Sequence, residues 1–189
     1  MLKADARKLY RDKRTALTVP EKAKDDDLLL IQFQSLQLPF IHVLFTYWPI
    51  GESNEPDTHL FTAYIGFKNP ALQILYPQAD FVNRRMQAVE VNADTTFTLN
   101  QHNIHEPATG RIVGPESIDM VFVPLLICDQ QGYRVGYGKG FYDKYLADCR
   151  TECIKVGFCY FDLPDKIDDR SEFDIPLDIC ITPYNVYVF

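Results

Sequence analysis

The segment Asp119-Met-Val-Phe-Val-Pro124 is followed by the glycine-rich run Gly132-Tyr-Arg-Val-Gly-Tyr-Gly-Lys-Gly-Phe-Tyr-Asp143. The first part is short and apolar, as is typical of a buried strand. After the run, residues 141–149 have helical spacing, with Phe141, Tyr145 and Cys149 on one stripe. A strand, a glycine-rich loop and a helix in this order predict one unit of an α/β fold.

The rest of the chain continues this alternation of apolar strands and helical segments. We expect helices over residues 2–17, 21–34 and 56–65, and strands over 41–47, 72–76, 86–91, 119–123, 154–160 and 178–182, with a last extended piece at 187–189. The alternation favours a three-layer α/β/α sandwich with a mostly parallel, Rossmann-like sheet. We expect one domain over residues 1–189, with Asp25, Asp26 and Asp27 on a solvated helix face.

Composition excludes several classes of protein. The formal net charge of -7 argues against general nucleic-acid binding, and 47% hydrophobic residues can fill a sizeable core. No apolar run approaches the length of a membrane span, and the N-terminal segment is charged. The five cysteines lack a Cys-x-x-Cys pair, so we expect reduced core thiols, with a metal site at Cys149 and Cys153 as the weaker alternative. These features predict a cytoplasmic protein, which we expect to be a monomer.

The glycine-rich run has the composition of a phosphate cradle. Alternating glycines allow backbone N–H groups to turn toward one point, while Arg134 and Lys139 supply charged donors. Asp143, on the first turn of the following helix, can hold a phosphate-bound magnesium ion. The run lacks the spacing of the Walker and dinucleotide loops. The alternative is a surface loop whose glycines serve turn geometry alone.

Basic residues also gather on the first predicted helix. Lys3, Arg7, Arg11 and Arg14 are spaced four, four and three residues apart, which places them on one face. The stripe is either a solvated face or, in an acidic protein, a sign of a nearby anion.

The loop between the first strand and the next helix lies where open α/β sheets bind ligands. Asn54 or Asp57 can serve as the helix cap, which leaves Glu55 without a structural role. Trp48 and Tyr47 offer aromatic faces for stacking, with core packing as the alternative, particularly for Tyr47.

Taken together, these motifs resemble the signature of 5-formyltetrahydrofolate cyclo-ligases, also called methenyltetrahydrofolate synthetases. The resemblance spans almost the whole chain and is carried by Lys3-x-x-x-Arg7, Glu55-x-Asp57-Thr58, Ile104-His105-Glu106-Pro107, residues 119–124, Cys128-Asp129, the run 132–146, Glu172-x-Asp174 and Ile181-Thr182-Pro183. Phe173 departs from the family, which often has histidine at that position.

The resemblance implies a ligase that closes a ring in 5-formyltetrahydrofolate, giving 5,10-methenyltetrahydrofolate, with ATP as co-substrate and Mg²⁺ as cofactor. It implies ATP binding by Lys3, Arg7, Arg134, Gly136, Gly138, Lys139, Gly140 and Tyr142. It implies folate binding by Glu55, Tyr137, Gly138, Lys139, Gly140 and Phe141. The catalytic residues would be Lys139 and Arg134, and the metal ligands Asp143 and Asp174, whereas Arg11 and Arg14 match less closely.

Two other classes remain as alternatives. One is a non-catalytic nucleotide- or folate-binding module of the same sheet, against which the set Arg134, Lys139, Asp143 and Asp174 argues. The other is a sugar-phosphate isomerase or CoA-transferase-like enzyme, which would need an acid/base pair or a nucleophilic glutamate rather than magnesium.

Overall fold

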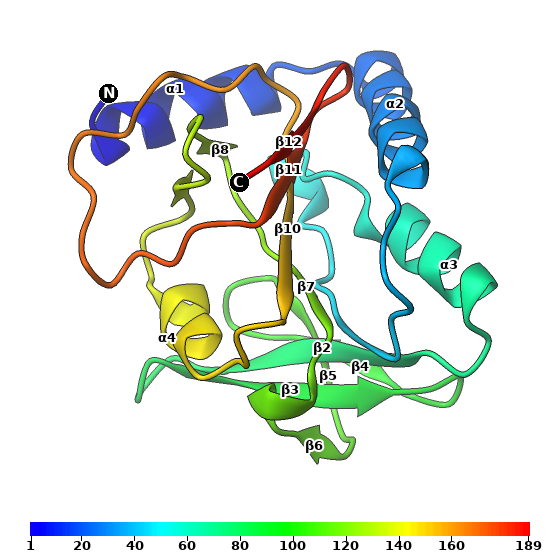
Figure 1. Ribbon diagram of the computed structural model, residues 1–189. Helices are drawn as coiled ribbons and strands as arrows, with labels where there is room; N and C mark the ends of the chain where they lie inside the picture. Colours follow the sequence, from blue (N-terminus) through cyan, green and yellow to red (C-terminus); the bar gives the residue numbers. More distant parts are fainter.

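The computed structural model describes residues 1–189 and contains one large mixed sheet (Figure 1). In spatial order its strands are β12 (Val186–Val188), β11 (Ile179–Ile181), β10 (Ile154–Phe158), β7 (Met120–Phe122), β1 (Val43–Phe45), β2 (Gln73–Asp80), β3 (Arg85–Val91) and β6 (Ile112–Val113). The five strands from β11 to β2 are mutually parallel. Antiparallel strands complete both edges. The predicted mostly parallel sheet is confirmed.

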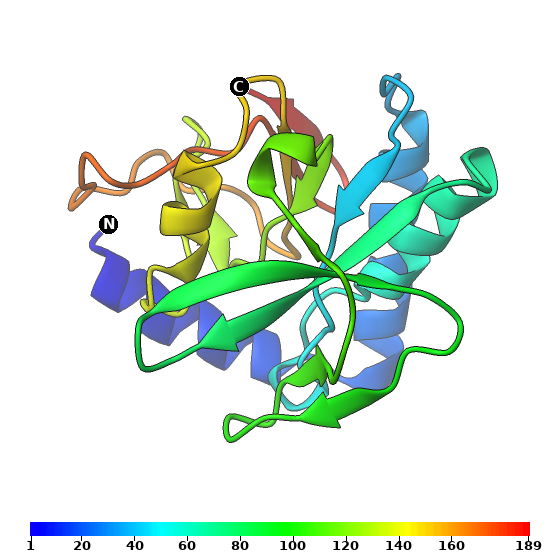
Figure 2. The ribbon, with the colours of Figure 1, turned by 90° about the horizontal axis from the view of Figure 1, so that it is seen from below.

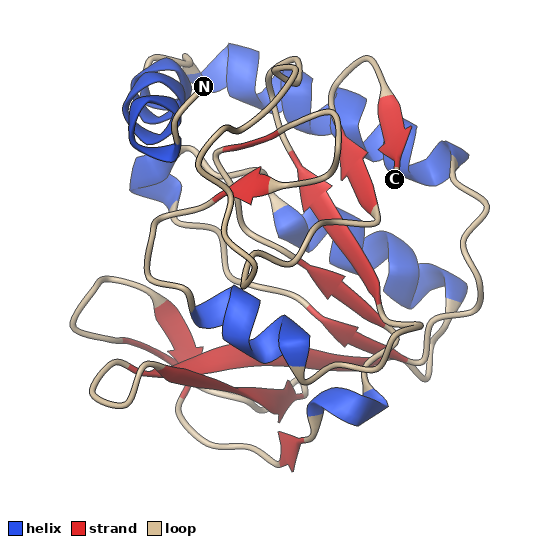
Figure 3. Cartoon of the chain, turned by 60° about the vertical axis from the view of Figure 1, so that its left-hand side comes forward, coloured by secondary structure: helices blue, strands red, loops and turns tan.

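Helices cover both faces of this sheet, which confirms the three layers. One face carries α1 (Lys3–Thr15) and α4 (Phe141–Ala147), and the opposite face carries α2 (Val19–Ser35) and α3 (Thr58–Lys68) (Figures 1 and 2). Figure 3 shows the strands as a twisted layer between the helices. Two short 3-10 turns, η1 (Gly51–Ser53) and η2 (Pro115–Ser117), precede α3 and β7 respectively. None of the helices combines the length and the apolar character needed to cross a membrane.

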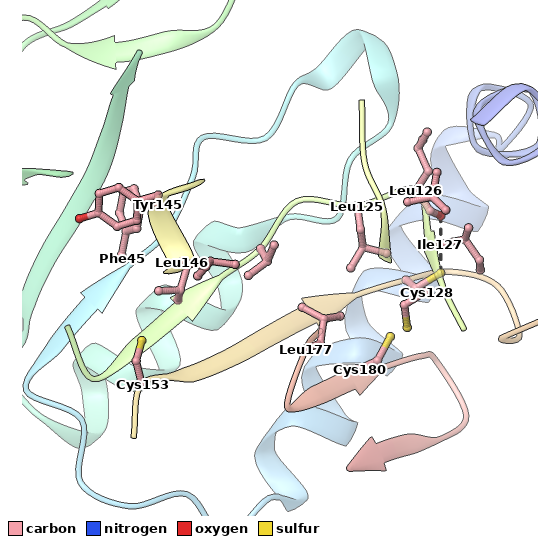
Figure 4. Close-up of a cluster of buried hydrophobic side chains, with 14 of the residues drawn as sticks. Phe45, Leu125, Leu126, Ile127, Cys128, Tyr145, Leu146, Cys153, Leu177 and Cys180 are labelled. Atoms are coloured by element: carbon pink, nitrogen blue, oxygen red, sulfur yellow. Dashed lines mark hydrogen bonds between the residues drawn. The ribbon is translucent and has the colours of Figure 1, made fainter. Parts of the chain in front are cut away.

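Side-chain alternation along the central strands builds a separate core on each face. In β7, Met120 and Phe122 pack into the cluster beneath α2 and α3, which includes Phe33. Val121 points the other way, into the cluster beneath α1 and α4, part of which is drawn in Figure 4 with Tyr145 labelled. The side chains that the central strands contribute to the two clusters are apolar, because a parallel strand that is covered on both faces has no side toward solvent.

Five strands of two or three residues were not predicted from the sequence. One is β6, which pairs with β3, and the other four form two small hairpins, β4 (Phe97–Leu99) with β5 (His105–Pro107) and β8 (Ile127–Cys128) with β9 (Arg134–Val135). Such strands are too short to show a period-2 pattern, so only their tertiary pairing reveals them. The glycine-rich run therefore begins as the second strand of a hairpin rather than as a loop throughout.

The expectation of a solvated Asp25–Asp27 face was wrong for the middle residue. Asp26 is buried, accepting hydrogen bonds from the Tyr160 hydroxyl at 2.6 Å and the Asp57 N–H at 3.1 Å. It also forms an ion pair with Lys22 at 2.6 Å. A buried carboxylate is tolerated when it is paired and hydrogen-bonded, and Asp26 thereby ties α2 to the start of α3. Asp57 itself caps α3 by accepting from the His59 N–H, as one of the sequence alternatives predicted.

Candidate active site

A cavity of about 330 Å³ lies at the carboxyl ends of β1, β2 and β7. Its wall combines residues of α1, the β1–α3 loop, the β2–β3 hairpin, the glycine-rich run and the segment before β11. Every residue to which the family resemblance gives a site role lines it: Lys3, Arg7, Glu55, Arg134, Gly136, Tyr137, Gly138, Lys139, Gly140, Phe141, Tyr142, Asp143 and Asp174. The parallel topology explains this convergence, because loops that follow parallel strands meet at one edge of the sheet.

The basic residues of the cavity differ in how they are held. Lys3 forms an ion pair with Asp174 at 2.5 Å, and Arg134 forms one with Asp143 at 2.8 Å. Arg7 donates from Nε to the Gly136 carbonyl oxygen at 3.0 Å. No hydrogen bond or ion pair involves the side chain of Lys139, which is exposed at the mouth of the cavity. Lys139 is thus a free cation beside three anchored ones.

The glycine-rich run uses left-handed backbone at the points where it bends. Gly138 has φ 82° and Gly140 has φ 73°, values that side chains other than glycine rarely adopt. Gly140 immediately precedes α4, so the run delivers the chain to the N-terminus of that helix. A Cβ atom on Gly138 would make an ordinary van der Waals contact of 3.4 Å with the Arg7 guanidinium, so the positive φ, rather than a lack of room, is what requires glycine there. Gly138 and Gly140 thus serve the turn geometry of the run.

Asp143 and Asp174 come from different elements but lie close in space. The backbone N–H of Ile175, the residue after Asp174, donates to the Asp143 carboxylate at 3.2 Å. Both carboxylates are part-buried and line the cavity. No group of three or more potential metal-ligating side chains occurs anywhere in the chain. The protein therefore offers two hard oxygen ligands here, and further ligands must come from a substrate or from water.

Glu55, unlike the two aspartates, is buried in the wall of the cavity. It is 2% exposed and accepts hydrogen bonds from the Ile50 N–H at 2.7 Å and from the Tyr137 hydroxyl. Burial raises the pKa of its carboxyl group above the ordinary value, although both hydrogen bonds and the nearby Arg14 oppose that rise. Glu55 is a buried acceptor at the cavity wall, which the helix-cap alternatives do not account for.

An apolar and aromatic wall completes the cavity, and of its residues only Tyr47 and Trp48 were predicted from the sequence. The ring of Trp48 lies 4.6 Å from that of His105 and 4.7 Å from that of Phe97, centroid to centroid. The lining residues that were given no site role from the sequence are Ile50, Pro77, Ala79, Phe81, Met86, His102, Ile104, Glu106 and Pro124. Most lie on the β2–β3 hairpin and in the β4–β5 region, where Ile104 and Glu106 belong to a stretch that carried the family resemblance without an assigned role. Tyr47 lines the cavity and is buried in the core beneath α2 and α3, so core packing is confirmed for it, whereas stacking on a ligand stays a prediction.

The remaining residues of the basic stripe do not reach the cavity. Arg11 is exposed on α1, as a solvated face would predict. Arg14 is 2% exposed and donates to the Ser53 and Leu125 carbonyl oxygens and to the Tyr137 hydroxyl. Only the N-terminal half of the stripe therefore faces the site. Tyr142 lines the cavity with a hydroxyl that has no hydrogen-bond partner in the protein.

Comparison with known proteins points to one family. The model of the 5-formyltetrahydrofolate cyclo-ligase family matches residues 3–166. The 5-formyltetrahydrofolate cyclo-ligase of Mycoplasma pneumoniae is 29% identical over 179 residues, which cover 93% of this chain and 94% of that protein. The Mycoplasma genitalium cyclo-ligase is 35% identical over a shorter match of 69 residues, 36% of this chain and 42% of that protein.

A solved structure agrees with the sequence matches. The structure of Aquifex aeolicus 5,10-methenyltetrahydrofolate synthetase superposes with a TM-score of 0.81 at 29% identity, covering 100% of this chain and 93% of that one. The likeness therefore extends over the sheet, the helices and the segments that form the cavity.

Proposed function

The chain belongs to the 5-formyltetrahydrofolate cyclo-ligase family, a family of ligases, and from that premise we propose that it converts 5-formyltetrahydrofolate to 5,10-methenyltetrahydrofolate. We propose further that the reaction consumes ATP, requires Mg²⁺ and releases ADP and phosphate. The protein would act as a cytoplasmic monomer with one domain over residues 1–189. Its five free cysteines, four of them buried, support a reducing compartment.

One observation carries the proposal: a single cavity combines a cationic, glycine-rich side with a buried carboxylate and an apolar wall. Lys3, Arg7, Arg134 and Lys139 suit a polyphosphate, whose charge they would neutralise. Glu55 suits the amino-pyrimidine edge of a pterin, because a carboxylate can accept two parallel N–H hydrogen bonds. The pterin and p-aminobenzoyl rings of a folate need apolar surface, which the wall around Trp48 supplies.

The chemistry follows from the poor leaving-group character of a formamide oxygen. That oxygen attacks the γ-phosphorus of ATP, and the bond to the departing ADP breaks. The second folate nitrogen then attacks the activated formyl carbon, phosphate leaves with the C–O electron pair, and the nitrogen loses its proton. Positioning and charge neutralisation by Lys139 and Arg134 suffice for such steps, so no covalent enzyme intermediate is needed. Phe141 and Tyr137 would face the folate, and Tyr142, whose buried hydroxyl has no hydrogen-bond partner in the protein, would contact the nucleotide.

The residues present fit a magnesium ion that is shared with the nucleotide. Asp143 and Asp174 would each supply a carboxylate ligand, and phosphate oxygens and water would supply the others. When bound, the ion would neutralise charge on the β- and γ-phosphates. Each carboxylate now pairs with a cation, so the arrival of a polyphosphate gives Arg134 and Lys3 new anionic partners and frees the two aspartates.

A direct assay tests the proposal. Purified protein is mixed with 5-formyltetrahydrofolate, ATP and Mg²⁺, and the absorbance of methenyltetrahydrofolate is followed. Product should form only when all three are present, with ADP and phosphate released in equal amounts. Binding of both ligands without turnover would support the non-catalytic module instead, and turnover without ATP would overturn the phosphoryl-transfer mechanism.

A further inference from the structure

Arg14 is the largest side chain buried almost completely in this protein, and it joins three segments of the site wall. Its Nε donates to the Ser53 carbonyl oxygen at 2.7 Å, and one terminal nitrogen donates to the Leu125 carbonyl oxygen at 3.0 Å. The other terminal nitrogen donates to the Tyr137 hydroxyl. These partners belong to the β1–α3 loop, the segment after β7 and the glycine-rich run, so Arg14 fixes the three loops relative to α1.

The guanidinium of Arg14 has no directly bonded carboxylate. A buried cation needs a counter-charge, because isolated charges are strongly disfavoured away from water. The Tyr137 hydroxyl supplies the connection: it accepts a hydrogen bond from Arg14 and donates its own proton to Glu55. Arg14, Tyr137 and Glu55 thus form one buried relay in which the charges lie at the two ends and the phenol in the middle.

From this relay we infer that Arg14 is a positioning residue for folate recognition, acting through Tyr137 to hold Glu55 as an ionised acceptor turned toward the cavity. The inference rests on the proposed function, since it assigns the purpose of a charged Glu55 to the pterin edge. A protonated Glu55 would present one donor and one acceptor, and would lose the paired acceptor geometry.

The electrostatic surroundings of Glu55 single out Arg14 among the nearby groups. Two cations face it, Arg14 from α1 and Lys22 from α2, together with the phenols of Tyr47, Tyr137 and Tyr142. Lys22 already pairs with Asp26 at 2.6 Å, so its charge is largely matched. Arg14 has only neutral direct partners. Removing it should therefore raise the pKa of Glu55 further, because desolvation would act with less opposition.

The test measures folate binding as a function of pH, with ATP binding as the internal reference. Dissociation constants of the whole protein for 5-formyltetrahydrofolate and, separately, for ATP are measured from about pH 6 to about pH 9. The variants are Arg14→Met, which removes the charge but keeps the bulk of the stem, and Arg14→Lys, which keeps the charge. Arg11→Met, one helical turn away and exposed, controls for the loss of an arginine from α1.

In the wild type, folate affinity should fall on the acidic side of the pH profile, where Glu55 becomes protonated. In Arg14→Met this acidic limb should move to higher pH, with folate affinity falling about tenfold per pH unit below the new pKa of Glu55. Affinity should recover toward that of the wild type at high pH, and ATP affinity should change less than about threefold at all pH values. Arg14→Lys should restore part of the wild-type profile, and Arg11→Met should match the wild type. A purely structural Arg14 would instead weaken folate binding equally at every pH, which overturns the inference.

Because Arg14→Met can fail to fold, Tyr137→Phe provides an independent readout. It breaks the relay while leaving both backbone contacts of Arg14 in place. Phenylalanine can neither donate to Glu55 nor accept from Arg14, so the inference requires that folate binding be lost at higher pH than in the wild type here too, and an unmoved profile refutes it. Failure of the proposed function is recognised separately, because wild-type protein would then bind no 5-formyltetrahydrofolate at any pH.

Discussion

Replacing Lys139 by alanine should separate catalysis from stability more cleanly than any other change in the cavity. Lys139 is exposed and its side chain has no partner in the protein, so its loss should alter the free energy of unfolding by no more than about 0.5 kcal/mol. A charge-assisted contact to phosphate contributes roughly 1.5–3 kcal/mol. At about 1.4 kcal/mol per factor of ten, kcat/KM for ATP should fall roughly 10- to 150-fold.

The assay is methenyltetrahydrofolate formation at varied ATP and saturating folate, with thermal unfolding measured on the same samples. Lys144→Ala is the matched control, since Lys144 is an exposed lysine on α4 that does not line the cavity. If Lys139→Ala keeps its melting temperature and also keeps wild-type ATP kinetics, Lys139 does not contact the phosphates. A large drop in melting temperature would mean that the loop geometry, rather than the charge, had been disturbed.

Three further outcomes are expected. Glu55→Ala should weaken 5-formyltetrahydrofolate binding while ATP affinity stays nearly intact, because Glu55 bonds to none of the cavity's lysines. Equilibrium titrations with each ligand separately check this, and equal losses of affinity for both ligands would mean that the role of Glu55 is structural. Asp143→Asn and Asp174→Asn should each raise the magnesium concentration needed for activity, with the double variant costing less than the sum; an unshifted magnesium titration at saturating ATP removes that residue from the metal site. Asp26→Ala should lower the free energy of unfolding by about 2–4 kcal/mol, whereas Asp27→Ala, at an exposed position, should change it little. Denaturant unfolding of both variants measures the difference, and similar free energies for the two would contradict the buried network around Asp26.

The sequence alone determined the parts of this protein that repeat a local pattern. Apolar runs such as residues 119–123 predicted buried parallel strands, because a strand covered on both faces has no polar side and is visible without its neighbours. The glycine spacing from Gly136 to Gly140, with Lys139 between, predicted a phosphate-binding loop, because backbone freedom and charge are properties of the residues themselves, and phosphate binding there stays a prediction. The predicted parallel sheet then implied where the loops would lie, since the loops that follow parallel strands meet at one edge of the sheet.

Only the tertiary structure decided which charged side chains are free and which are paired or buried within the protein. Lys3, Arg7 and Arg14 have equivalent places on one helical stripe, yet one pairs with an aspartate, one supports the glycine-rich loop and one is buried behind Tyr137. Asp26 likewise is buried and hydrogen-bonded because Tyr160, more than a hundred residues away in the chain, donates to it. Burial and pairing depend on atoms from distant segments, and a linear pattern carries no information about that desolvation.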